Sequence, residues 1–245
     1  MPIPAGLRAL SFDLDDTLWP IRPVLARAED ALHAYLERHC PRTAEAFPRE
    51  RLRALREQVA AEHPQLAHDF MAQRLICLER ALAESGEDSA HARPAAAALY
   101  VERNRVEFYA DALPALDVLG ERFPLAALTN GNADLQRIGI DRRFVAIVAA
   151  RDFGVAKPER AIFEHTVERL GVAAADVLHV GDDPWLDVAG AARAGLRTCW
   201  VNRDGGLWPA ELPPPDLEVL HLGALVAALA PHGPAARTGS RQRTG

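Results

Sequence analysis

Residues 9–18 read Ala-Leu-Ser-Phe-Asp-Leu-Asp-Asp-Thr-Leu, an apolar run that ends in three acids and a hydroxyl. The run predicts a buried strand that delivers Asp13, Asp15 and Asp16 at its end. Two like charges about 4 Å apart repel by roughly 4 kcal/mol at an effective dielectric of 20, so the cluster implies a cation or a shared proton. An ordinary turn or helix N-cap has the same local pattern, so the other strand ends must decide between the two.

A second apolar run, residues 124–128, is followed by Thr-Asn-Gly-Asn. It predicts a buried strand with an oxyanion site at its carboxyl end. Thr129 would donate its hydroxyl there, and the amides of Asn130 and Gly131 would point at the anion. A plain turn and N-cap is the alternative for this segment.

Lys157 precedes Pro158 at the start of a predicted helix. Proline suits the first helical turn and restricts the preceding residue to extended geometry, so we expect the ammonium to be held at the site. A lysine and proline alone also form an ordinary solvated helix start. The motif therefore gains its weight from the other three.

A further apolar run, residues 177–180, ends in Gly181 and is followed by acids. Asp182 falls at the strand end, and Asp187 lies in or near the first turn of the next helix. Such hard oxygen ligands suit Mg²⁺ far better than zinc. Asp183 can instead cap that helix, and His179, which has no Cys or His partner at metal-ligand spacing, is expected to pack in the core.

Taken in order, four motifs resemble those of the haloacid dehalogenase-like hydrolase superfamily: Asp13-Leu14-Asp15-Asp16-Thr17, Thr129, Lys157-Pro158, and Gly181-Asp182 with Asp187. The resemblance implies a phosphatase in which Asp13 is the nucleophile and Asp15 is first a general acid and then a general base.

The same resemblance implies Mg²⁺ as the cofactor. Asp13, Asp182 and the backbone carbonyl of Asp15 would hold the ion, with Asp187 behind it. Lys157 would add positive charge. Thr17 would form a hydrogen bond within the first loop and fix the Asp13 carboxylate.

Softer positions resemble bacterial flavin mononucleotide phosphatases: residues 12–18, 22–24, 68–69, 129–132 and 179–190. This implies flavin mononucleotide or 5-amino-6-(5-phosphoribitylamino)uracil as substrate. The alternatives are another small-metabolite phosphatase acting on a nucleotide, phosphoglycolate or a sugar phosphate, or a phosphosugar mutase. A 2-haloacid dehalogenase, whose first motif resembles Asp-x-Tyr, and a non-catalytic binding protein fit less well.

The chain alternates strands and helices outside one long segment. Apolar runs near residues 7–13, 124–129, 144–149, 176–180 and 196–201 alternate with helical patterns at 132–139, 158–170 and 184–195, and a last strand and helix are expected near 217–220 and 223–230. This predicts an α/β fold, a Rossmann-like parallel sheet with helices on both faces.

Residues 19–109 carry no strand pattern, and their apolar residues recur at helical spacing, which predicts an inserted all-helical cap. We therefore expect a core of residues 1–18 and 110–230, a cap of residues 19–109 and a disordered tail of residues 231–245. Candidate specificity residues are Trp19, Arg22, His68, Asp69 and Arg74, and Trp19 or Trp185 could offer a flavin an aromatic face.

Composition narrows the function further. The 245 residues are 49% hydrophobic with a net charge of −6, which argues against nucleic acid and favours a small-molecule substrate. Cys40, Cys77 and Cys199 are odd in number and widely spaced, which fits reduced thiols. The N-terminus lacks the order of a signal peptide and no 18-residue apolar run occurs, so we expect a cytoplasmic monomer or homodimer without a membrane partner.

Overall fold

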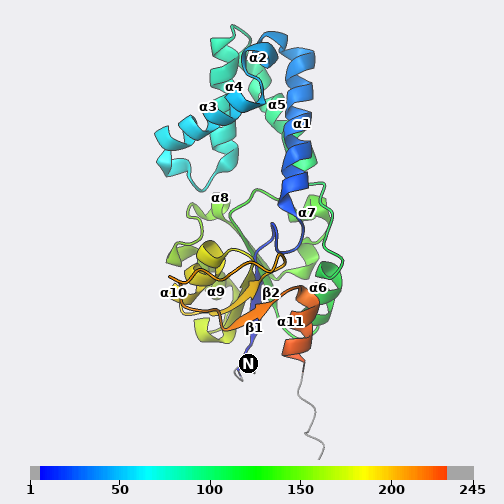
Figure 1. The fold of residues 1–245 in the computed structure, drawn as a ribbon, viewed down its shortest axis with the longest axis vertical. Coiled ribbons are helices and arrows are strands. Elements are labelled where there is room, and N and C mark those ends of the chain that lie inside the picture. The colour runs from blue at the N-terminus through cyan, green and yellow to red at the C-terminus, as the bar shows by residue number, and fades with distance from the viewer. Residues whose placement is uncertain (1–5, 231–245) are drawn as a thin grey trace, which may run out of the picture.

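The computed structural model describes residues 6–230. A parallel sheet forms the lower half of the molecule and a group of helices the upper half (Figure 1). The strand order is β3-β2-β1-β4-β5-β6, which confirms the predicted parallel α/β sheet. The strands are β1 (Ala9–Phe12), β2 (Leu125–Thr129), β3 (Ala146–Ala149), β4 (Val177–Gly181), β5 (Arg197–Val201) and β6 (Leu217–Val219).

The direction of strand addition reverses next to β1. The chain moves from β1 outward through β2 to β3, then crosses to β4 on the other side and continues to β6. Phe12 of β1 lies beside Val180 of β4, so the residues that follow these two strands emerge together. Ligands of open α/β sheets bind at such a reversal, outside the carboxyl ends of the strands.

Successive residues of β1 face opposite sides of the sheet, as the pleat requires. The helices that follow the inserted segment are α6 (Ala112–Gly120), α7 (Leu135–Ile138), α8 (Ala150–Phe153), α9 (Arg160–Leu170), α10 (Gly190–Arg193) and α11 (Leu222–Leu229). Leu10 and Phe12 belong to the hydrophobic cluster that includes α6 and α11. Ala9 belongs to the cluster that includes α9 and α10.

Some of these helices differ from the sequence expectations. The helix expected at 132–139 is only the single turn α7, because Asp134 caps its start and Gly139, with φ of +85°, ends it. The helix expected at 184–195 begins as the wide turn η5 (Pro184–Ala189), which is of the π type, and continues as α10. Neither α6 nor the single turn α8 was expected from the sequence.

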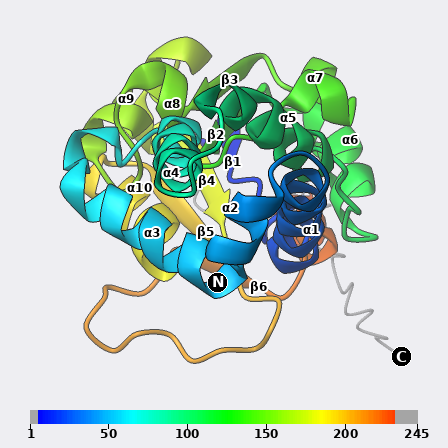
Figure 2. The same ribbon diagram turned by 90° about the horizontal axis from the view of Figure 1, so that it is seen from above.

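The helices inserted between β1 and α6 form a bundle of their own. They are α1 (Ile21–His39), α2 (Pro41–Ala46), α3 (Arg49–Glu62), α4 (Phe70–Glu84) and α5 (Ala92–Arg103). Their buried residues, among them Leu32, Val59, Leu78 and Leu82, make a cluster separate from the two clusters on the sheet. Seen from above, the bundle lies over the carboxyl ends of the strands (Figure 2).

The expected amphipathic helices are therefore present. The division into a core of 1–18 and 110–230 and a cap of 19–109 stays our interpretation, and the expected tail of residues 231–245 lies outside the described residues. Cys40, Cys77 and Cys199 are all buried free thiols. Within residues 6–230, the helices lack the combination of length and apolar character that a membrane span needs.

Candidate active site

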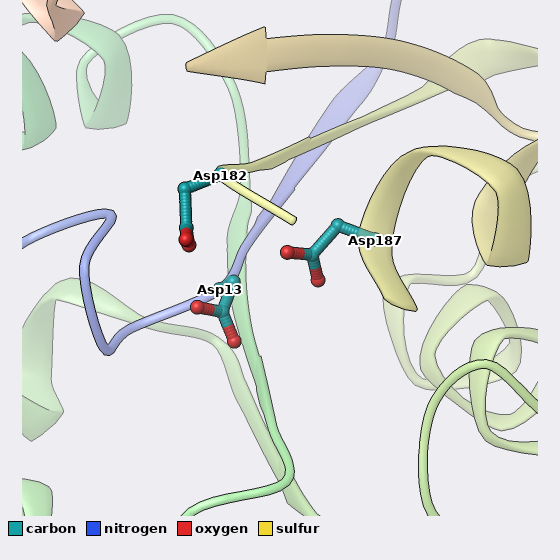
Figure 3. A group of neighbouring side chains, drawn as sticks. All are labelled: Asp13, Asp182 and Asp187. Carbon is teal, nitrogen blue, oxygen red and sulfur yellow. The ribbon is translucent and has the colours of Figure 1, made fainter. Parts of the chain in front are cut away.

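Three carboxylates converge where β1 and β4 end. Asp13 follows β1, Asp182 follows β4, and Asp187 lies in η5. One oxygen of each lies within 4.8 Å of the others. Figure 3 shows the carboxylates of Asp182 and Asp187 pointing toward the region of Asp13. Asp13 and Asp187 are buried, so their charges require compensation.

Lys157 supplies part of that compensation. Its Nζ lies 2.5 Å from Asp13 Oδ1 and 2.5 Å from Asp187 Oδ1. When all three carboxylates are ionised, the single ammonium leaves two negative charges, which is the charge of a site for a divalent cation. Hard oxygen donors of this kind suit Mg²⁺. The residues present therefore fit the cofactor that the sequence motifs imply.

The pKa values reflect this crowding. Burial raises the pKa of Asp13 well above its usual range, although Lys157 opposes the shift. Burial and the neighbouring Asp187 carboxylate raise the pKa of Asp182 to about 7. Burial would also raise the pKa of Asp187, but Lys157 and His179 hold it well below its usual range. Burial alone would lower the pKa of Lys157, yet Asp13 and Asp187 raise it above its ordinary value.

His179 takes part in this network, which the sequence reasoning missed. It packs in the sheet core as expected, with its ring edge-on to Phe163. Its Nε2, however, lies 3.2 Å from Asp187 Oδ1, and its Nδ1 lies 2.8 Å from Ser11 Oγ. Burial lowers the pKa of His179 although Asp187 opposes the shift, which favours the neutral ring. The sequence did offer one signal, because Ser11 and His179 are each a polar residue within an apolar strand. In the structure the two residues lie side by side on neighbouring strands.

A glycine lets Asp187 approach β4. A Cβ built on Gly181 would lie 2.3 Å from Asp187 Cγ, closer than any side chain can stand. Asp183 caps η5 by accepting from the backbone amides of Trp185 and Leu186 at 2.7 and 2.8 Å. The alternative interpretation of Asp183 as a helix cap is therefore confirmed.

Thr17 has a different partner from the one expected. Its hydroxyl donates to Asp182 Oδ1 at 2.9 Å rather than orienting Asp13. The left-handed backbone of Asp16, with φ of +57°, reverses the chain, and Thr17 thereby reaches the neighbouring strand end. Asp16 itself accepts from the amide of Ile21, the first residue of α1, at 2.9 Å.

The loop after β2 is tied to Lys157. The Asn130 side chain accepts from the Lys157 amide at 2.7 Å and donates to the Lys157 carbonyl at 2.9 Å. Asn130 therefore holds the lysine segment in place. The Gly131 amide donates to Thr129 Oγ1 at 2.9 Å, so it is engaged within the loop, whereas the Thr129 hydroxyl keeps its own proton to donate.

Asp15 accepts hydrogen bonds from two side chains that lie far apart in the sequence. Trp19 Nε1 donates to Oδ1 at 2.8 Å. Arg103, the last residue of α5, donates from Nη2 to Oδ1 at 2.9 Å and to Oδ2 at 2.7 Å. Arg103 was not among the predicted site residues, and no local pattern marks it.

A cavity of about 370 Å³ opens beside Asp15, between the first loop and the helical bundle. Of the candidate specificity residues, Arg74 lines it and pairs with Glu29 at 2.5 Å. Trp19 is fully buried, and Asp69 caps α4. The remaining lining is largely apolar and includes Ile21, Leu25, Phe70, Met71 and Leu99.

Comparisons with known proteins agree with this geometry. A 5-amino-6-(5-phospho-D-ribitylamino)uracil phosphatase of Escherichia coli, YigB, is 32% identical over 231 residues, which cover 91% of this chain and 96% of that protein. A glyceraldehyde 3-phosphate phosphatase of Methanopyrus kandleri is 31% identical over 209 residues, covering 80% and 84%. The crystal structure of a 2-haloacid dehalogenase from Pseudomonas syringae matches with a TM-score of 0.85 and 36% identity, covering 91% of this chain and 98% of that one.

The family model of the haloacid dehalogenase-like hydrolases matches residues 7–195, a range that holds all four motifs. The predicted family resemblance is confirmed, and the prediction that the chain is a phosphatase is supported by two relatives that are phosphatases. The chain belongs to the haloacid dehalogenase-like hydrolases.

Proposed function

We propose that this protein is a Mg²⁺-dependent phosphomonoester hydrolase that forms a phosphoaspartyl intermediate on a small phosphorylated metabolite. The observation that carries the proposal is the Lys157 ammonium placed between Asp13 and Asp187, beside the Asp182 carboxylate. A phosphate dianion cannot approach a carboxylate nucleophile unless positive charge surrounds both. Mg²⁺ held by Asp13, Asp182 and the Asp15 carbonyl, with Asp187 behind them, would supply the larger part of that charge.

The chain's own residues carry the chemical steps. An Asp13 oxygen attacks phosphorus, the ester bond to the alcohol breaks, and Asp15 gives its proton to the departing oxygen. Asp15 then takes a proton from water, which attacks the phosphoaspartate, releases phosphate and restores Asp13. Lys157 offsets the charge on Asp13, and the Thr129 hydroxyl donates to the transferring phosphoryl group.

Flavin mononucleotide and 5-amino-6-(5-phosphoribitylamino)uracil are the preferred substrate candidates. Two observations support them: the named activity of the Escherichia coli relative, and a cavity beside Asp15 with an apolar lining that suits a heterocycle. The Methanopyrus relative supports a smaller phosphorylated metabolite instead. A mutase would share the same residues and would depend on a bisphosphate activator.

A 2-haloacid dehalogenase is the second candidate function, favoured by the structural match of 36% identity. A halide leaves without a proton, so that reaction has no use for an acid at Asp15. Here Asp15 is present and held by Trp19 and Arg103. We therefore expect no chloride release from 2-chloropropionate, and chloride release at a rate above that of phosphate release would favour the dehalogenase.

The first experiment measures phosphate release with and without Mg²⁺. The panel comprises flavin mononucleotide, the ribitylaminouracil phosphate, nucleoside monophosphates, phosphoglycolate and sugar phosphates. We expect release that depends on Mg²⁺, with one of the two riboflavin-related phosphates ahead in kcat/KM. Folded, Mg²⁺-supplied protein that releases no phosphate from any of them would contradict the proposal.

A further inference from the structure

The Arg103 guanidinium has one donor that the protein does not use. Only 3% of the side chain is exposed. Its Nη2 donates to both oxygens of Asp15, and its Nε donates to Asn132 Oδ1 at 3.1 Å. Nη1 is buried and has no hydrogen-bond partner within the part of the chain that the structure describes. A buried charged donor left unpaired is unfavourable, and each such group in a folded protein calls for an explanation.

Arg103 lines the cavity beside Asp15, together with Gly131 and Asn132 from the sheet domain and Phe70 and Leu99 from the bundle. Since Nε and Nη2 already have partners, Nη1 is the one donor of this cavity-lining side chain that has no partner among the described residues. Asn132 fixes the plane of the guanidinium from the side of the sheet, so the direction of that donor is set before any ligand arrives.

We infer that Arg103 binds the leaving group of the substrate through Nη1, and that it selects alcohols with a hydroxyl close to the ester oxygen. The inference rests on the proposed phosphatase function, because it takes Asp15 as the acid that meets the ester oxygen. The nitrogen that holds Asp15 and the free nitrogen share one carbon atom. An acceptor bound at Nη1 therefore lies near the oxygen that Asp15 protonates.

This position gives the substrate class. A polyol or sugar phosphate carries hydroxyls on the carbons next to the ester and satisfies Nη1. A plain alkyl phosphate of the same length leaves the donor unpaired. A site with a buried donor rejects an analogue that lacks the matching oxygen more strongly than an apolar pocket rejects a change of shape.

The test uses two phosphates of equal chain length, ribitol 5-phosphate and n-pentyl phosphate, because both need the general acid and only one carries hydroxyls. We expect the wild-type protein with Mg²⁺ to prefer ribitol 5-phosphate in kcat/KM. Arg103→Lys keeps the positive charge near Asp15 but loses the planar guanidinium and with it the Nη1 donor. It should reduce that preference by about tenfold or more. The matched control is Arg105→Lys, at an exposed arginine paired with Glu102, and should keep the wild-type preference.

Trp19→Phe separates specificity from the orientation of Asp15. It removes the other donor to Asp15 from a residue outside the cavity lining, so both rates should fall and the preference should stay. If Arg103→Lys also lowers both rates in the same proportion, Arg103 only holds Asp15 and the inference is wrong. A wild-type protein without preference between the two phosphates would also overturn it.

Calorimetric binding of the two phosphates distinguishes this inference from the proposed function. Binding that favours ribitol 5-phosphate and requires Arg103, in a protein that hydrolyses neither compound nor any phosphate of the panel, would keep Arg103 as the residue that binds the hydroxyl and would refute the proposed phosphatase activity. Hydrolysis of both compounds, with a preference that Arg103→Lys leaves unchanged, would support the phosphatase activity and refute the role inferred for Arg103.

Discussion

The carboxyl ends of β1 and β4, called the sheet edge below, and the helical bundle differ in how they use charged residues. At the sheet edge Asp13, Lys157 and Asp187 are each less than a tenth exposed and contact one another directly. In the bundle, pairs such as Arg53 with Glu57 lie mostly in solvent. Buried charges act strongly because water screens them little, whereas exposed pairs contribute little. The reaction chemistry therefore belongs to the sheet edge, and the bundle can change its surface without altering that chemistry.

Asp15 is where the two regions meet, since Trp19 precedes the bundle and Arg103 ends it. The comparison predicts that substitutions at the sheet edge abolish the reaction for every substrate. Substitutions at Asp15 should depend on the leaving group. Substitutions at exposed positions of the bundle helices should change neither the reaction rate nor the free energy of unfolding appreciably.

Asp13→Asn should have the largest effect. Without the attacking carboxylate, kcat for phosphate release should fall by at least about 10⁴-fold for all substrates. Asp117→Asn, at an exposed aspartate of α6 paired with Arg143, is the matched control and should retain the wild-type rate. A wild-type rate in Asp13→Asn would sink the assignment of the nucleophile.

Asp15→Asn should lower the rate by about 10²- to 10⁴-fold for alkyl phosphates, which leave poorly without a proton. The loss should be much smaller for p-nitrophenyl phosphate, whose leaving group is stable as an anion. Mg²⁺ binding, measured by calorimetry, should persist because only the backbone carbonyl of Asp15 is proposed as a ligand. Equal losses for both leaving groups would contradict the role of Asp15 as acid.

These residues differ in how far the sequence alone could identify them. Asp13, Asp182 and Lys157 come from segments that follow apolar strands or precede a helix, and parallel strands bring such positions to one edge. Their grouping was predictable from local patterns. The structure adds their convergence and the hydrogen bonds that connect them.

Thr17 and Arg103 show what the local pattern lacks. Thr17 reaches an aspartate 165 positions away, and only the left-handed backbone at Asp16 decides which carboxylate it contacts. Arg103 meets Asp15 across 88 positions, through the path of the whole inserted bundle. Neither partner leaves a periodic signal in the sequence. Contacts that depend on how a loop turns, or on where the chain returns after an inserted segment, can therefore be found only from the structure.

Lys157→Met tests how much the buried ion pairs at the sheet edge contribute to the free energy of unfolding. Removing one partner of a buried ion pair leaves uncompensated charge, and we expect a loss of about 3–5 kcal/mol in the metal-free protein. Added Mg²⁺ should restore part of it by replacing the lost positive charge. Urea unfolding with and without Mg²⁺ measures both effects.

Arg53→Met is the counterpart in the bundle. Arg53 is about three-quarters exposed and pairs with Glu57 at 3.6 Å, so the change should stay within about 0.5 kcal/mol. Similar losses for Lys157→Met and Arg53→Met would show that burial does not distinguish the two regions, and the comparison would fail.

The dependence of Mg²⁺ binding on pH should give a smaller effect than the loss of Lys157. The pKa of Asp182 is raised from 3.8 to about 7 in the metal-free protein. The folded state therefore binds this proton more tightly than the unfolded state. The stability that the proton contributes is complete below about pH 4 and is lost as the pH rises through 7. Mg²⁺ needs the carboxylate, so it competes with the proton below pH 7.

The increase in unfolding free energy caused by a fixed Mg²⁺ concentration should therefore be larger at pH 8 than at pH 6, by roughly 1.4 kcal/mol. Thermal unfolding at both pH values, with and without Mg²⁺, measures it. Asp182→Asn serves as the control, because it has no carboxyl to titrate and should show little Mg²⁺ stabilisation at either pH. Equal stabilisation of the wild-type protein at pH 6 and pH 8 would mean that Asp182 does not hold the metal, and the charge balance at the sheet edge would then need another explanation.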